Sequence, residues 1–349
     1  MPRIPVTVLG ATGVVGQRFV RHIAAHPVFE LRFLAASERS AGRTYGEACD
    51  WRLPGDPFAG AGAMRVLPCD PGAALSPIVF SALDAGPARE IESAFAAAGA
   101  LVFSNASAFR MEEDVPLLVP ELNAAHLGLL ALQRARRGWK GGIVCNPNCT
   151  TAVFVGAFGP LHRAFGAEAA LAASMQALSG AGYPGVPSLD AASNVIPLIR
   201  GEEEKLEAES RKILGAFDGR AVVPAPFTVS AMCNRVPVVD GHTIAASMRL
   251  GGSPEPVDVV RALERFVPDT EGMGLHTAPQ RFLQVRSEPD RPQPRLDVDA
   301  DGGMRVQVGR VRRCPVLGVK MVVLGHNLER GAAGASVLNA ELALARGCL

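Results

Sequence analysis

The sequence of 349 residues lacks an excess of either charge. It has 35 Lys and Arg against 34 Asp and Glu, a net charge of +1, and no long run of one sign. Proteins that bind nucleic acids or anionic membrane surfaces usually present a strongly basic face, so we expect neither partner. The densest basic segment, 134–140, follows a helical pattern and is interpreted as a solvated helix end.

Long apolar runs and paired cysteines are also missing. No stretch reaches the roughly 18 apolar residues that a membrane-spanning helix needs, and residues 1–5 lead into a strand without the apolar core of a signal peptide. The 7 cysteines are odd in number and form no C-x-x-C pair, which favours reduced thiols in a cytoplasmic protein. Cys145 and Cys149 have no partners at zinc-ligand spacing, so no metal site is expected.

The beginning of the chain has the order strand, glycine turn and helix. The β-branched run 6–9 precedes three glycines spaced G-x-x-G-x-x-G, which differs from the commoner G-x-G-x-x-G, and a helical pattern follows. Glycine lets the backbone approach a ligand closely, and a helix N-terminus attracts a pyrophosphate. The turn therefore predicts a dinucleotide site, whose contacts would be Gly10, Thr12, Gly13, Val14, Val15 and Gly16.

A second strand, 31–37, ends where the ribose of such a dinucleotide should lie. An acidic residue here would hold the 2′-hydroxyl of NAD, whereas an arginine with small hydroxyl residues suits the 2′-phosphate of NADP. Ser37, Arg39 and Ser40 form such a cradle, so we predict NADP. Glu38 keeps NAD open as an alternative.

Two domains are expected from the length and from a change of pattern near residue 150. Strands 78–83 and 101–105 alternate with helix 88–98, which indicates a parallel, doubly wound sheet covered on both faces. Ser81 stands at a strand end, where ligands of such sheets bind, but it is equally well explained as a turn residue. We predict an NADP-binding domain at 1–148, completed by a C-terminal helix in 327–349, and a catalytic and dimerisation domain at 149–326.

Cys149 is the most informative residue. It lies between the apolar strand 142–145 and a helix-forming run that starts at Thr150. The positive end of a helix dipole favours a thiolate over a thiol, so the position predicts a reactive nucleophile. The alternative is a buried cysteine packed as a small hydrophobe.

The motifs together resemble aspartate-β-semialdehyde dehydrogenase of the archaeal and fungal type, over nearly the whole chain. They lie at 10–19, 34–42, 146–149, 175–185, 201–205, 233–237, 240–243 and 325–327. The resemblance implies a Rossmann-type domain followed by an α+β domain with a mixed sheet, as in glyceraldehyde-3-phosphate dehydrogenase. It also implies a homodimer or homotetramer, for which the apolar runs 169–175 and 319–324 are candidate surfaces, although buried core strands would have the same pattern.

The implied reaction is the NADPH-dependent reductive dephosphorylation of L-4-aspartyl phosphate to L-aspartate 4-semialdehyde, a step in lysine, threonine and methionine biosynthesis. Cys149 matches the nucleophile, which expels inorganic phosphate and leaves a thioester. His242 matches the acid/base group that serves the thiohemiacetal.

The resemblance also assigns the binding residues. Arg235 would clamp the substrate α-carboxylate, Gln176 would orient the reacting carbonyl, and Glu202 would receive the ammonium group. The implied phosphate pocket consists of Arg110, Asn148 and Lys205, and the implied nicotinamide contacts are Asn327, Ser179 and Gly180. One departure is Leu328-Glu329, where the family commonly has Thr followed by Ile or Val.

Two other functions stay open at this point. An acyl-CoA reductase, such as malonyl-CoA reductase, would need the same Cys149, His242 and Arg235. It has less use for a phosphate pocket, so the presence of Arg110 and Lys205 favours the semialdehyde enzyme. A non-catalytic NADP-binding sensor would be expected to lose the nucleophile or the base, and both are present.

Overall fold

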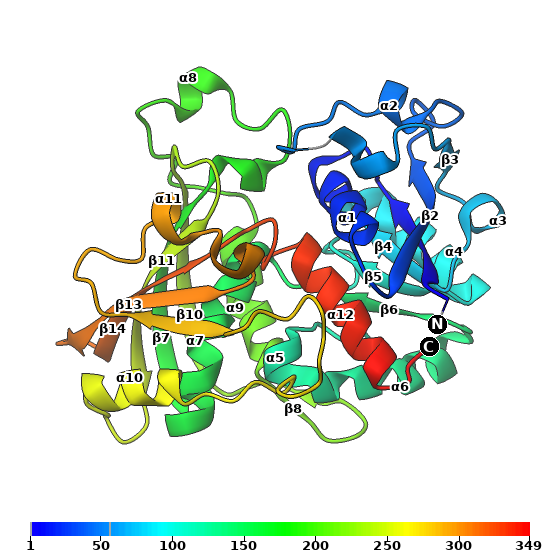
Figure 1. Ribbon diagram of the computed structural model, residues 1–349. Helices are drawn as coiled ribbons and strands as arrows, with labels where there is room; N and C mark the ends of the chain where they lie inside the picture. The colour runs from blue at the N-terminus through cyan, green and yellow to red at the C-terminus, as the bar shows by residue number, and fades with distance from the viewer. Residues whose placement is uncertain (1, 56) are drawn as a thin grey trace.

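The protein has two α/β lobes that lie side by side, as the computed structural model in Figure 1 shows for residues 2–55 and 57–349. The first lobe is built on a six-stranded sheet of order β3-β2-β1-β4-β5-β6, in which all pairs are parallel. Its strands are β1 (Ile4–Leu9), β2 (Phe29–Ala36), β3 (Val66–Pro68), β4 (Ile78–Ser81), β5 (Leu101–Ser104) and β6 (Gly142–Cys145). This is the strand order of a Rossmann-type doubly wound sheet, so the predicted fold is confirmed.

The order of the strands reverses between β1 and β4, and a ligand crevice is expected beside that point. The four main helices of this lobe are α1 (Val14–Ala24), α4 (Ala85–Ala98), α6 (Leu129–Arg137) and α12 (Ala333–Ala345). The last of these comes from the C-terminal end of the chain and packs against α1 and β5, so both chain termini lie at this lobe (Figure 1). Its apolar residues share one core cluster with β1, β2 and β4.

The second lobe contains a mixed six-stranded sheet of order β10-β7-β11-β14-β13-β12, also as predicted. The strands are β7 (Ala167–Gln176), β10 (Thr228–Arg235), β11 (His242–Leu250), β12 (Leu283–Arg286), β13 (Val306–Cys314) and β14 (Gly318–Gly325). Three helices contact the sheet or one another: α7 (Cys149–Phe165), α9 (Glu202–Ile213) and α10 (Pro256–Glu264). Side chains along β7, β10 and β11 alternate between buried and exposed, which shows that one face of the sheet is uncovered.

The apolar core continues across the predicted boundary at 148/149. One cluster joins Val79 and Val102 of the first sheet to Phe154 of α7 and to Ile244 of the second sheet. α7 is buried along most of its length, and it therefore connects the two lobes as a shared core element.

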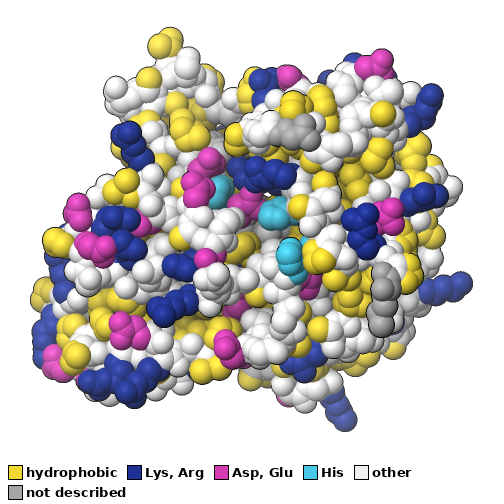
Figure 2. Space-filling model, viewed as in Figure 1, with side chains coloured by type: hydrophobic (Ala, Val, Ile, Leu, Met, Phe, Trp, Pro, Cys, Tyr) yellow, Lys and Arg dark blue, Asp and Glu magenta, His cyan; other side chains and the backbone are white. Residues whose placement is uncertain are grey.

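Shorter elements fill the connections. They are α2 (Tyr45–Ala48), η1 (Pro57–Gly60), α3 (Pro71–Ala74), α5 (Pro120–Asn123), η2 (Ala124–Gly128), η3 (Leu178–Ala181), α8 (Ser188–Ala191), β8 (Ala216–Phe217), β9 (Val222–Val223), α11 (Pro294–Asp297) and η4 (Ala300–Gly303). Within the described ranges, no helix is both long enough and apolar enough to cross a membrane. On the face in Figure 2, basic and acidic side chains are interspersed, in keeping with the small net charge.

Candidate active site

Cys149 is the first residue of α7, and the cap of that helix holds it in place. Asn148 is the N-cap, and its side-chain oxygen accepts hydrogen bonds from the N–H groups of Thr150 and Thr151 at 3.0 and 3.1 Å. The Asn148 N–H donates to a carboxylate oxygen of Glu209 at 2.6 Å. Both ends of the turn are thereby fixed, and the sulfur projects from a rigid helix start.

His242, the first residue of β11, reaches the same point from the second sheet. Its Nε2 lies 3.2 Å from Sγ of Cys149. Its Nδ1 accepts a hydrogen bond of 3.1 Å from the N–H of Ala177. A neutral imidazole has one protonated nitrogen, so the Ala177 contact assigns the proton to Nε2, which faces the sulfur.

The electrostatics of this pair differ from the sequence expectation. Burial, followed by the charge of Glu202, raises the pKa of Cys149 to about 12. Burial, followed by the charge of Arg235, lowers the pKa of His242 to about 3. Burial therefore opposes the effect of the helix N-terminus on which the expectation of a thiolate rests. The reactivity of Cys149 stays a prediction.

The residues predicted to bind substrate gather around Cys149. Gln176 ends β7 and Arg235 ends β10, and these residues pair in register in the parallel sheet. A guanidinium nitrogen of Arg235 donates to the carbonyl of Ala177 at 2.7 Å. Gly180 covers Arg235 and His242 so closely that an added Cβ would lie 2.8 Å from Arg235. A side chain at 180 would therefore displace the guanidinium of Arg235 from its place in the site.

Glu202 links this group to the helix cap. Its carboxylate accepts hydrogen bonds from the side-chain amide of Asn148 at 2.8 and 2.9 Å, and from Gln176 at 3.4 Å. It also pairs with Lys205 at 3.1 Å. A carboxylate so placed can receive an ammonium group while it orients two amides.

Arg110 is present but already engaged. It donates to the buried carboxylate of Glu209 at 3.1 Å and to the carbonyl of Asn105 at 2.7 Å, while its buried Nε has no partner. Glu209 was not predicted, although it follows Glu202 by seven residues and so lies on the same face of α9. The seven-residue spacing in a predicted helix could therefore have identified Glu209 as a candidate site residue.

These side chains line one cavity of about 440 Å³. Of the predicted residues, its walls include Val14, Val15, Arg110, Asn148, Cys149, Gln176, Ser179, Gly180, Glu202, Lys205, Arg235 and Asn327. His242 is fully buried and lies behind the sulfur. Asn327 is held from both sides. Its side-chain NH2 donates to the Ser179 hydroxyl at 2.8 Å, and its side-chain oxygen accepts from the Gly241 N–H at 2.9 Å.

A second cavity of about 820 Å³ shares Val14 and Val15 with the first and extends over the glycine turn. Its walls include the predicted cofactor residues Gly10, Thr12, Gly13, Val14, Val15, Ser37 and Arg39. Gly10 has φ of +68°, and an added Cβ would lie 2.6 Å from the carbonyl oxygen of Ala82. The bare backbone, the size of the cavity and Arg39 at its rim fit a dinucleotide with a phosphorylated ribose.

Three predicted cofactor residues do not line these cavities. Ser81 is fully buried in β4. Ser40 lies in the turn beyond Arg39, outside the cavity lining. Gly16 packs against the turn itself, since an added Cβ would be 2.2 Å from the Gly10 carbonyl oxygen. Its role is close packing of helix on turn.

Arg52 and Tyr183 are among the residues that line the cofactor cavity without having been predicted as site residues. The guanidinium of Arg52 lies 4.1 Å from the ring centre of Tyr183, which belongs to the loop after η3. This stacked pair bridges the two lobes beside the cofactor groove. Tyr183 lies in the motif at 175–185, but its contact with Arg52 depends on how the lobes meet and has no local signal.

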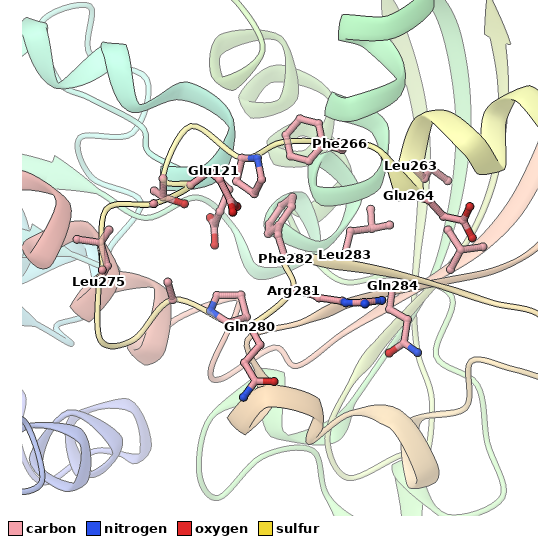
Figure 3. A pocket seen from close by; sticks show the side chains of 18 residues that line it. Glu121, Leu263, Glu264, Phe266, Leu275, Gln280, Arg281, Phe282, Leu283 and Gln284 are labelled. Carbon is pink, nitrogen blue, oxygen red and sulfur yellow. The ribbon is translucent and has the colours of Figure 1, made fainter.

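Another cavity, of about 640 Å³, lies beside the loop between α10 and β12 (Figure 3). Phe266, Phe282 and Leu283 form part of its wall, and Gln280 and Gln284 lie near its edge. Its lining within the described residues includes no cysteine, histidine or predicted site residue. The candidate catalytic and cofactor-binding residues therefore lie at the cavities around Cys149 and the glycine turn. No group of three or more His, Cys, Asp or Glu in the described part of the chain is suited to a metal.

Comparison with known families gives two matches that cover most of the chain. A family model for a semialdehyde dehydrogenase NAD binding domain matches residues 5–130. A model for a semialdehyde dehydrogenase dimerisation domain matches residues 158–330.

Individual relatives are similar over nearly their full lengths. An aspartate-semialdehyde dehydrogenase of Archaeoglobus fulgidus is 52% identical, with 97% of this chain and 98% of the relative covered. The enzyme of that name from Cryptococcus neoformans is 46% identical, with 100% and 99% covered. A solved structure, aspartate semialdehyde dehydrogenase with NADP from Candida albicans, superposes with a TM-score of 0.91 at 41% identity and covers 100% of both chains.

Proposed function

The chain belongs to the aspartate-semialdehyde dehydrogenase family, and we propose that it reduces L-4-aspartyl phosphate to L-aspartate 4-semialdehyde with NADPH. The reaction serves lysine, threonine and methionine biosynthesis. The observation that carries the proposal is the 3.2 Å contact of Cys149 with His242 at a cavity that adjoins the cofactor groove. The acyl-CoA reductase and the sensor are not favoured by the relatives.

We propose that the reaction begins with attack of Sγ on the acyl phosphate carbonyl. The C–S bond forms as the C–O bond to phosphate breaks, and the thiol proton leaves with the phosphate as the hydrogen phosphate dianion. Arg110 and Lys205 supply positive charge for that leaving group, and a stabilised leaving group lowers the barrier to attack. The raised pKa of Cys149 fits this proton balance, because it favours the thiol.

When bound, NADPH supplies the hydride that reduces the thioester. The negative oxygen on the resulting Cys149 adduct needs a hydrogen-bond donor, and we assign this role to Nε2–H of His242. Collapse of the adduct breaks the C–S bond, releases the aldehyde and leaves a thiolate, which takes a proton from solvent. The Nε2–H group of His242 thus faces Sγ of Cys149 in the free protein and would donate a hydrogen bond to the adduct oxygen during the reaction.

The remaining assignments are also proposals. Arg235 would bind the substrate α-carboxylate through its free guanidinium nitrogens, Glu202 would bind the ammonium, and Gln176 would orient the carbonyl. Residues 1–148 with the C-terminal helix would hold NADP, and 149–326 would carry the catalytic and assembly functions. The seven unpaired cysteines suit a reducing compartment, so we propose a cytoplasmic protein.

The proposed function is tested by supplying aspartate semialdehyde, NADP and phosphate, and by following NADPH formation in the reverse direction. The expected result is turnover that depends on phosphate. Parallel reactions with malonyl-CoA and NADPH should show little turnover. Efficient reduction of malonyl-CoA without turnover of the semialdehyde would replace the proposal by an acyl-CoA reductase.

Replacing Arg39 by Ala should raise the KM for NADP by about 10-fold or more, since a charge-assisted phosphate contact is lost. The KM for NAD should change little, because NAD has no 2′-phosphate. Arg43→Ala is the matched control: Arg43 lies in the same segment but contacts the carbonyl of Glu47 and does not line the cavity. An equal rise for both cofactors in Arg39→Ala would assign Arg39 a structural role.

Assembly is proposed to use the uncovered face of the second sheet. Leu171 and Met232 are 49% and 64% exposed there and flank an apolar groove of about 420 Å³ that Arg312 and Lys320 border. An uncovered apolar sheet face marks an interface, and a family model for this region is described as a dimerisation domain. We propose a homodimer that can pair further into a homotetramer.

Met232→Glu should therefore yield a smaller species, measured as mass by light scattering, because it buries a charge in the proposed interface. Leu189→Glu is the control, since Leu189 is 91% exposed on α8 and lies outside that groove. An unchanged mass for Met232→Glu would place the interface elsewhere.

A further inference from the structure

The segment 326–332, between β14 and α12, touches both halves of the site. Asn327 lines the cavity and is fixed by Ser179 and Gly241. Gly331 rests on the nucleophile, since an added Cβ there would lie 2.5 Å from Cβ of Cys149. A small shift of this segment would therefore move Asn327 and the wall beside Cys149 together.

Glu329 lies in the middle of this segment and points to the other side. Its side chain is 3% exposed, and its carboxylate contacts three basic side chains of α1. The distances are 2.5 Å to Arg18, 3.0 Å to Arg21 and 2.6 Å to Nε2 of His22. Because α1 starts at the glycine turn, this one carboxylate joins the cofactor helix to the segment that borders Cys149.

Neighbouring backbone confines the side chain further. An added Cβ on Gly303, in η4, would lie 3.0 Å from Cβ and Cγ of Glu329 and 2.9 Å from the ring of His326. Glu329 is therefore held between η4 on one side and α1 on the other. It has little freedom to adopt another rotamer.

Charge keeps the group ionised. Burial acts to raise the pKa of Glu329, but the hydrogen bond from His22 and the charges of His22, Arg18 and His326 lower it to about 2. A buried carboxylate paired with basic side chains adds little net stability, because the cost of removing the charges from water offsets their attraction. Its main effect here is to hold the paired segments in one arrangement. Figure 2 shows histidine and basic side chains at the surface where the two lobes meet.

We propose that Glu329 is a positioning residue: by pairing with Arg18, Arg21 and His22 it fixes segment 326–332 against α1, so that the nicotinamide end of the cofactor groove stays aligned with Cys149. This inference rests on the proposed function. Glu329 touches neither substrate nor cofactor groove and acts through Asn327 and Gly331. The ion network that it forms depends on its carboxylate.

The test compares Glu329→Gln with Glu341→Gln. Glu341 is a matched control on α12: its side chain is 5% exposed and lies 2.7 Å from Nε2 of His26, just beyond the end of α1. It also accepts from the N–H of Thr277 at 3.0 Å, so its contacts lie away from segment 326–332. Both variants lose one buried carboxylate charge, and both should lower the melting temperature.

Three quantities separate a positioning role from a structural one. They are kcat at saturating NADP, the KM for NADP, and the protection that NADPH gives Cys149 against iodoacetamide. Glu329→Gln should lower kcat by about 10-fold, because a misplacement of reacting groups by about 1 Å can cost about 10²-fold and a smaller shift costs less. It should also weaken the protection, whereas Glu341→Gln should leave kcat and protection within about twofold of the starting protein.

The protection measurement needs no substrate, so it separates the two proposals. If the starting protein fails to oxidise aspartate semialdehyde, the proposed function falls, while the difference in protection still tests Glu329. Arg21→Gln is the second variant should Glu329→Gln not fold, since Arg21 is partly exposed; it should weaken protection in the same direction. The proposal would be overturned if Glu329→Gln and Glu341→Gln had the same kcat and the same protection by NADPH. Unchanged protection in Arg21→Gln would also overturn it.

Discussion

Cys149→Ser is expected to lower kcat by at least about 10³-fold while NADPH still binds, because a serine hydroxyl is a far weaker nucleophile than a cysteine thiol and has no strong base beside it. The structure sharpens this expectation. His242 directs a protonated nitrogen at position 149, so it cannot take the hydroxyl proton in that tautomer. Turnover by coupled NADPH absorbance and NADPH binding by fluorescence are the two measurements.

Cys145→Ala provides the matched control for this variant. Cys145 is four residues away at the end of β6, is fully buried, and does not line the active-site cavity. It should keep most of the turnover, although the loss of a buried sulfur costs about 1 kcal/mol of stability. A Cys149→Ser protein with substantial activity would contradict the assignment of the nucleophile.

His242→Ala is expected to lower kcat by about 10²- to 10³-fold, the range found when a donor to a developing oxyanion is removed. Glutamine can place an amide N–H near the position of Nε2, whereas asparagine is shorter. His242→Gln should therefore keep more activity than His242→Asn or His242→Ala. Equal activities in the three variants would argue that the hydrogen bond from Nε2 contributes little.

The pH dependence follows from the same geometry. The pKa of His242 is lowered from 6.5 to about 3, so the ring stays neutral through the working range and should give no limb in the pH profile near 6.5. Burial raises the pKa of Cys149, so its alkylation in the free protein should keep rising as the solution becomes alkaline. A plateau of the alkylation rate already reached near neutral pH would show a stabilised thiolate and contradict this account.

Local patterns in the sequence were sufficient for the first lobe. The strand, turn and helix around Gly10 are encoded within about twenty consecutive residues, and the structure has β1, the glycine turn and α1 in that order. Cys149 at the start of α7 was equally predictable, because an N-cap is a local signal. The pattern at 169–175 was ambiguous between core and surface, and only the packing shows Leu171 exposed while Ala172 is buried.

Properties that depend on packing could not be predicted. The pKa of Cys149 is raised by burial and by the charge of Glu202, which no local signal reports. Ser81 was a reasonable ligand candidate by its place at a strand end, yet its side chain is enclosed. Glu329 was visible only as a departure from the related motif, and its contacts with α1 arise from a helix more than three hundred residues earlier.

The most direct test of the account is to mix the protein with aspartate semialdehyde and NADP in the absence of phosphate, and to determine the mass of the peptide that contains Cys149. A covalent thioester should form on Cys149 together with a burst of NADPH stoichiometric with the protein, and added phosphate should discharge it and start turnover. A burst without any adduct on Cys149, or an adduct on another cysteine, would contradict the central claim.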